Sequence, residues 1–241
     1  MRIPRAAAAL ALGLAACSGN TLLPEPARDQ LEQQLAGHVR YLRVACFVTP
    51  FFHDGGKLLL TDQSPDEVDL VEKPNGEPVD PGAPIKVLPP GTPLRIQEIS
   101  FPTAFVMAER TVAFTPREDP WVLLRRPDDF HRDDKPYVLV LPPDVKTAEG
   151  FRERLGEYLS PDDPTADFHA LSAEIRAAVT QKTVLPGMTP HEVEMAWGYP
   201  EQIHIDGPTR SETWTWPFQK QRAWFAGGTL AKWDDHGHPG P

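Results

Sequence analysis

Two cysteines, eight histidines and several paired aspartates are the residues of this chain whose chemistry could support catalysis or metal binding. Cys46 lies in the apolar, strand-like run YLRVACFV, without the helix start or the paired histidine that activates a thiol. We therefore expect Cys46 to be a buried structural thiol. The chain also contains no G-x-S-x-G segment, the pattern that places a hydrolase serine on a strand-to-helix turn.

Carboxylate pairs are the next candidates. The stretch RRPDDFHRDDKP carries two pairs of aspartates, at 128–129 and 133–134. Glycoside hydrolysis uses two carboxylates, but nothing in the sequence selects one pair, and a solvated loop explains both. A cell-wall hydrolase with a carboxylate site therefore stays an alternative function.

The C-terminal segment Asp234-Asp235-His236-Gly237-His238 contains side chains that bind divalent metals. It belongs to a short polar terminus, and such termini are commonly disordered. We expect a disordered tail over residues 234–241 and keep metal binding by this tail as a second alternative. The main expectation is a protein without catalytic residues, metal or other cofactor.

Tryptophans near the C-terminus are the candidate partner-binding residues. Trp214 and Trp216 alternate in SETWTWPF and so share one face of an expected strand, and Trp224 lies in the following strand. Aromatic side chains are favoured at the centres of protein interfaces. Packing in the core of a small sheet is the competing interpretation and the simpler one.

The first residues resemble a bacterial lipoprotein signal. Arg2 and Arg5 precede an apolar run too short to span a membrane, and Leu14-Ala15-Ala16-Cys17 matches the lipoprotein box. The resemblance implies cleavage before Cys17 and acyl chains on Cys17 that anchor the protein. Ser18 after the cysteine favours the outer membrane, with the protein on its periplasmic face.

Net charge limits the partners. Removal of residues 1–16 takes away two arginines and no acidic residue, which changes the formal charge from −10 to −12. Nucleic-acid binding needs basic patches, so we expect none. An acidic chain also gains little from anionic lipid, so the acyl chains would be the membrane contact. Once Cys17 is lipidated, Cys46 has no partner for an intramolecular disulfide.

A β-rich domain is expected over residues 39–145. Short segments rich in β-branched and aromatic residues alternate there with the turn clusters DGG, PNGEP, DPGAP and LPPGTP. This pattern is typical of a small, mostly antiparallel barrel or sandwich. The chain holds 28 prolines, over twice the average of about 5%, which also indicates short elements. Segment 87–99, VLPPGTPLRIQEI, resembles bacterial SH3-like domains, in which such a turn leads into a strand.

Helical patterns flank this domain. We expect a short helix from Asp29, as N-cap, to Val39, with Leu31 and Leu35 on one face. It would follow the lipidated tether, so residues 17–38 form one unit. Residues 146–167 are expected to be a helix followed by an acidic linker. A further helix is predicted over Asp167–Leu185 from an apolar stripe at three- and four-residue spacing.

The stretch LPGMTPHEVEMAWGYPEQ raises the question of a ligand-binding loop, because glycine turns before helices can bind anions. Thr189 and Glu192 instead fit a capping box, with Pro190 at the first helical position. Gly198 fits a left-handed helix end, after which Tyr199 would pack on Val193. We therefore predict one short helix over 190–197 and no phosphate site. Three or four strands follow, with a hairpin at Gly227-Gly228.

This C-terminal region resembles the BamE (SmpA/OmlA) lipoprotein domain, a two-helix, three-strand α+β unit of the outer-membrane β-barrel assembly machinery. The matching residues are Gly187-Met188-Thr189, Val193, Gly198, Pro200 and Trp214-Thr215-Trp216, within residues 168–233. In the family this domain lies close to the lipidated cysteine, whereas about 150 residues intervene here. The resemblance implies the fold and, as a further possibility, a role among envelope assembly proteins.

The expected protein is thus an α+β lipoprotein of the cell envelope. A signal peptide over 1–16 precedes a lipidated tether, a β-rich domain, a linking helix and a BamE-like domain. We expect a non-catalytic role in outer-membrane assembly, scaffolding or protein binding.

Overall fold

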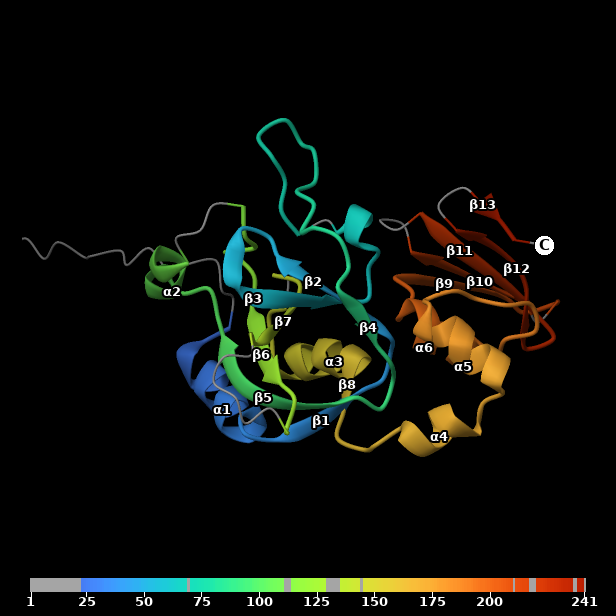
Figure 1. Ribbon diagram of the computed structural model, residues 1–241, viewed down its shortest axis with the longest axis horizontal. Coiled ribbons are helices and arrows are strands. Elements are labelled where there is room, and N and C mark those ends of the chain that lie inside the picture. Colours follow the sequence, from blue (N-terminus) through green and yellow to red (C-terminus); the bar gives the residue numbers. More distant parts are fainter. Residues whose placement is uncertain are drawn as a thin grey trace, which may run out of the picture.

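The computed structural model describes residues 23–68, 70–110, 114–128, 135–143, 145–209, 211–216, 220–235 and 238–240. The fold is α+β, as expected, with a curled mixed sheet and a separate antiparallel sheet (Figure 1). Cys17 and the signal-like segment lie outside the described residues.

The first sheet has the strand order β4-β2-β3-β7-β6-β5-β1-β8. Its strands are β1 (Val39–Leu42), β2 (Cys46–Phe51), β3 (Asp54–Thr61), β4 (Lys86–Leu88), β5 (Pro93–Ser100), β6 (Trp121–Arg125), β7 (Tyr137–Val140) and β8 (Leu159–Ser160). Neighbouring strands are antiparallel except β3 and β7, which pair in parallel through Leu59↔Val138 and Leu60↔Leu139. The expected mostly antiparallel arrangement holds, but the strands form one open, curled sheet and not two packed sheets.

Two helices close the first core. Helix α1 (Glu25–Leu35) contributes Leu31 and Leu35, and α3 (Ala148–Tyr158) contributes Phe151 and Leu155. The sheet curls around them in Figure 1. The helix expected at the start of residues 146–167 is α3, and it belongs to the first unit together with β8.

Helix starts depend on local capping. Helix α1 begins four residues before the expected N-cap Asp29, because a proline fits the first turn, where its missing N–H costs nothing. Thr147 caps α3 by accepting from Gly150 N at 3.0 Å. The helix expected over 167–185 is two helices, α4 (Thr165–Ala170) and α5 (Ala173–Thr180), because Ser172 accepts from Ile175 N and starts a new one.

The second unit is a sheet covered on one face by helices. Its strands, in spatial order β13-β12-β11-β10-β9, are β9 (Gln202–Asp206), β10 (Ser211–Trp216), β11 (Gln221–Ala226), β12 (Thr229–Asp235) and the short β13 (His238–Pro239). Gly227 and Gly228 form the expected hairpin turn with positive φ. Because β13 pairs with Asp234 and Asp235, the expectation of a disordered tail is wrong for these residues.

Two short helices lie outside the two cores. They are η1 (Pro65–Glu67) and α2 (Ala104–Glu109).

Helix α6 (Pro190–Trp197) has the predicted capping box. Glu192 N donates to Thr189 Oγ1, and Thr189 N donates to Glu192 Oε2 at 2.6 Å. Met188 and Val193 are buried together in the second core. These contacts account for every special residue at the start of α6, so the stretch is a helix signal and not an anion loop.

The end of α6 departs from expectation. Gly198 has φ 89° and ψ −176°, so its φ is positive but its backbone is not in the left-handed helical conformation. Tyr199 packs on the first core and lies under the Arg43 guanidinium, 5.1 Å from the ring centre, and does not return to Val193. The chain thus leaves α6 toward the first unit.

The two units meet at a buried lysine. Lys182 Nζ donates at 2.7 Å to the carbonyls of both Ala45, between β1 and β2, and Ala196, in α6. Ala45 N in turn donates to Met195 O at 2.7 Å. Lys182 has φ 55°, a conformation that costs a residue with a Cβ roughly 1 kcal/mol, and its side chain is only 8% exposed.

Asp62 completes this junction, which comprises Ala45, Asp62, Tyr158, Lys182 and Gly198. Tyr158 Oη donates to Asp62 Oδ1 at 3.2 Å. Burial raises the pKa of Asp62 and lowers the pKa of Lys182, while each charge partly offsets the shift of the other. A Cβ at Gly198 would overlap Asp62 Oδ2 and stand 3.0 Å from its Cγ.

We predict that Gly198→Ala lowers the free energy of unfolding by roughly 2 to 3 kcal/mol, measured by urea denaturation. The backbone of Gly198 lies in a region of positive φ and extended ψ that costs other residues about 1 to 3 kcal/mol, and displacing the Asp62 carboxylate adds to this cost. Gly187→Ala is the matched control, since Gly187 has φ 84° and nothing within 4 Å of its Cβ position. Equal losses in the two variants would show that the approach to Asp62 is unimportant.

Candidate functional site

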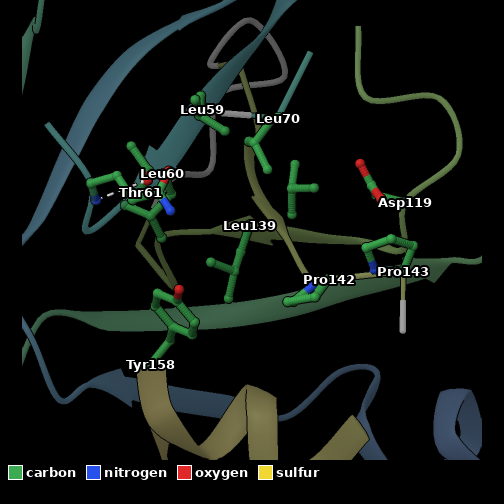
Figure 2. Close-up of a pocket in the computed structure, with 11 residues that line it drawn as sticks. Leu59, Leu60, Thr61, Leu70, Asp119, Leu139, Pro142, Pro143 and Tyr158 are labelled. Atoms are coloured by element: carbon green, nitrogen blue, oxygen red, sulfur yellow. Dashed lines mark hydrogen bonds between the residues drawn. The ribbon is translucent and has the colours of Figure 1, made fainter. Parts of the chain in front are cut away.

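A cavity of about 420 Å³ lies beside the junction, within the usual size range of ligand sites. Figure 2 shows Tyr158 reaching it from the end of α3 and Asp119 from the loop before β6, with Leu139 and Pro142 between them. Its walls are mostly apolar. The lining residues are Leu59, Leu60, Thr61, Gln63, Leu70, Asp119, Leu139, Val140, Pro142, Pro143 and Tyr158.

The parallel pairing of β3 and β7 explains the position of this cavity. Both strands run in the same direction, so their carboxyl ends, at Thr61 and Val140, reach the same edge of the sheet. The two chains then diverge, one toward Gln63 and the other through Pro142 and Pro143. Chain divergence at the carboxyl ends of strands is where open sheets leave crevices for ligands.

Four polar side chains face the cavity. Gln63 N donates a hydrogen bond to Thr61 Oγ1 at 3.1 Å. The Tyr158 hydroxyl donates its hydrogen bond to Asp62. The Gln63 Oε1 atom is buried and has no hydrogen-bond partner among the described residues. Since an unpaired buried acceptor costs about 1 to 3 kcal/mol, this oxygen is a natural contact for a bound donor.

Asp119 is the fourth polar group, and its pKa is strongly perturbed. Burial raises the pKa of its carboxyl to about 7, although Arg110 opposes the shift and Glu118 adds to it. The two Nη atoms of Arg110 donate to the carbonyls of Arg117, Asp119 and Ser100, and the guanidinium stacks on Trp121 at 3.7 Å. Asp119 therefore lines the cavity without a full counter-charge.

A second, smaller hollow adjoins the first at the junction. It has a volume of about 260 Å³ and shares Gln63, Pro142 and Tyr158 with the cavity. Asp62, Glu157 and Glu201 line it together with Arg154, and so does the buried Trp216, whose Nε1 has no partner among the described residues. The region around Tyr158 is thus rich in carboxylates.

The three expected partner-binding tryptophans do not form one surface. Trp214 and Trp216 are 4% and 1% exposed and pack in the second core, as the competing interpretation held. Trp224 lies opposite Thr213 on the other face of the sheet, between Arg222 and Lys232. The alternation along β10 and β11 separates these side chains, so of the three only Trp224 lies outside the second core.

The edge strand β9 carries the exposed apolar residues of this sheet. Ile203 and Ile205 are 51% and 64% exposed and are the only exposed large apolar side chains among the described residues that share a strand. Ile203 lies opposite Trp214, so both point to the face that the helices cover further along the sheet. The apolar face thus extends past the helices to an edge with no further strand.

The other sequence candidates do not come together. Cys46 is fully buried, and burial raises the pKa of its thiol, which fits the expected structural role. Of the aspartate pairs only Asp128 is described; 129, 133 and 134 lie outside the described residues, as does His236 of the tail. Within the described part of the chain, no group of three or more His, Cys, Asp or Glu side chains could hold a metal.

No described helix is both long and apolar enough to cross a bilayer. Comparisons of the chain with protein-family models, with curated proteins and with solved structures found no match. The resemblances to known families consequently rest on the quoted residues alone. The residues that line the cavity had no recognisable sequence signal, since Asp119, Gln63 and Tyr158 come from three separate segments.

We predict that Asp119→Asn stabilises the protein at pH 8 and not at pH 4. A carboxyl whose pKa is about 7 when folded and about 3.9 when unfolded favours folding only while protonated. The stability that the protonated Asp119 carboxyl contributes is fully present below pH 4 and is lost as the pH rises through 7. The loss in unfolding free energy is roughly 2 to 4 kcal/mol. The measurement is the difference in unfolding free energy between variant and wild type at both pH values.

Asp128→Asn is the control, because Asp128 is exposed and its replacement by Asn removes the same charge as Asp119→Asn. A stability difference for Asp119→Asn that is the same at pH 4 and pH 8 would contradict the raised pKa.

Proposed function

We propose that the protein is a non-catalytic lipoprotein of the cell envelope that is anchored in the outer membrane through Cys17 and binds other envelope proteins. The lipoprotein box supports the anchor. Leu23 is 4% exposed in the first core, so only residues 18–22 separate Cys17 from the folded body. At about 3.3 to 3.6 Å per residue, the body would stay within roughly 20 Å of the membrane.

We further propose that residues 168–233 form a BamE-like unit. Helices α5 and α6 on an antiparallel sheet of tryptophan-bearing strands, with the capping box at Thr189, fit that resemblance. The SH3-like resemblance is supported only locally, by the turn between β4 and β5. The assembly or scaffolding role is proposed on the BamE-like unit.

The observation that best supports protein binding is the β9 edge, which we define as residues 202–206 with the exposed side chains of Ile203 and Ile205. An edge strand presents free backbone donors and acceptors that pair readily with an added strand. A partner strand laid on β9 would also cover the two isoleucines. Glu201, Asp206 and Glu212 surround this edge, so we propose an extended segment with alternate apolar side chains and flanking Lys or Arg.

We predict that a photo-crosslinking amino acid at position 205 captures one membrane-associated protein through a segment of this description. Peptide mapping of the crosslink identifies the segment. Combining this crosslinker with Ile203→Lys should reduce the crosslinking yield about tenfold, because a charge on the inward face of an edge strand opposes strand addition. Cys17→Ser should abolish both palmitate labelling and the crosslink, since the protein then leaves the membrane.

His204→Lys is the matched control, since it makes a similar change on the opposite face of the same strand and should leave the crosslink intact. Three results would overturn the proposal: a crosslink to a second copy of this chain, a crosslink unaffected by Ile203→Lys, or wild-type protein without the palmitate label.

A further inference from the structure

We propose that the cavity between the ends of β3 and β7 and helix α3 binds a small organic cation, a protonated amine on an apolar body. The site does not depend on the proposed protein-binding edge, because its residues belong to the first unit. The inference combines the shape of the cavity, the hydrogen-bonding capacity of its polar groups and the balance of charge around them.

The apolar wall accounts for the body of the ligand. Leucines from β3 and β7 form one side, and Pro142 and Pro143 form another (Figure 2). A volume of about 420 Å³ exceeds what a few waters fill, and water in such a cavity would gain few hydrogen bonds from these walls. An alkyl or aromatic group of small size would displace that water favourably.

The polar side chains of the cavity mainly offer acceptors. Gln63 Oε1 is unpaired, and the Tyr158 hydroxyl keeps only its lone pairs once it donates to Asp62. Asp119 offers carboxylate oxygens. No Lys, Arg or His is among the lining residues. Only the Thr61 hydroxyl and the Gln63 amide can donate there, so a ligand rich in donors fits the site best. An ammonium group brings three donors and no acceptor.

The charge of Asp119 is compensated only in part, by the nearby Arg110. Arg110 faces a different hollow, lined by Asp54, Lys57 and Glu98, and its Nη1 and Nη2 atoms donate to backbone carbonyls and to Ser100, not to the Asp119 carboxylate. Asp119 also lines a further hollow, where Arg117 and Lys146 are matched by Glu72 and Glu118 and leave no positive charge in excess for Asp119. A ligand ammonium in the cavity would supply the missing counter-charge in a poorly solvated setting, where charge-assisted hydrogen bonds are strong.

An anionic ligand of the same shape is disfavoured. A fatty carboxylate would face Asp119 at one end of the cavity and Asp62, behind Tyr158, at the other. Like charges in a site of low polarity repel strongly. A neutral alcohol would keep the apolar contacts but lose the charge interaction, so it should bind more weakly than the amine.

The experiment uses three ligands with the same six-carbon chain: hexylamine, hexan-1-ol and hexanoate. Each is titrated into the purified protein at pH 8, with binding measured by calorimetry and by chemical-shift changes of the leucine methyl groups. For ligands of this size we expect millimolar dissociation constants. Hexylamine should bind about tenfold more tightly than hexan-1-ol, and hexanoate should bind most weakly.

Asp119→Asn should remove most of the preference for the amine over the alcohol, while Asp128→Asn leaves it unchanged. The affinity for hexan-1-ol reports whether the variant retains the cavity. The proposal is overturned if hexylamine does not bind, if alcohol or hexanoate binds as tightly as the amine, or if Asp119→Asn keeps the full preference.

Discussion

Lys182 joins two segments that are far apart in the sequence, and the arrangement of both units depends on it. Its ammonium group links Ala45 in the first unit to Ala196 in the second, across 137 residues on one side and 14 on the other. Burial of an unpaired charge costs several kcal/mol. Two charge-assisted hydrogen bonds, together with the nearby Asp62 carboxyl, offset that cost. A Cβ at Gly198 would displace the same Asp62 carboxylate.

The junction also determines what each unit leaves open. Tyr158 donates to Asp62 and so presents an acceptor to the cavity. On the other side, the contact of α6 with Ala45 keeps the helices over β10 to β12, and β9 remains an uncovered edge with Ile203 and Ile205 exposed. The two proposed binding regions, for a small ligand in the first unit and a protein segment on the second, therefore lie on either side of the Lys182 junction.

Sequence reasoning succeeded where neighbouring residues determine the structure. The capping box of α6 and the Gly227-Gly228 hairpin involve residues within a few positions of one another, and both were predictable. The attachment of α3 to the first core and the contact of Lys182 with Ala45 were not, because periodicity carries no information on which elements meet. The cavity was missed for the same reason: Asp119 is a single aspartate before Pro120, and only the fold brings it near Gln63 and Tyr158.

The most direct test of this account is the unfolding of Lys182→Met in urea, followed by tryptophan fluorescence and far-ultraviolet circular dichroism. Wild type should unfold in one transition. The variant leaves the carbonyls of Ala45 and Ala196 unpaired and Asp62 without its cation, so it should lose about 3 kcal/mol and show two transitions. Lys232→Met, at an exposed position over Trp224, should behave as wild type. A single transition for Lys182→Met, at the wild-type midpoint, would contradict the central role of the junction.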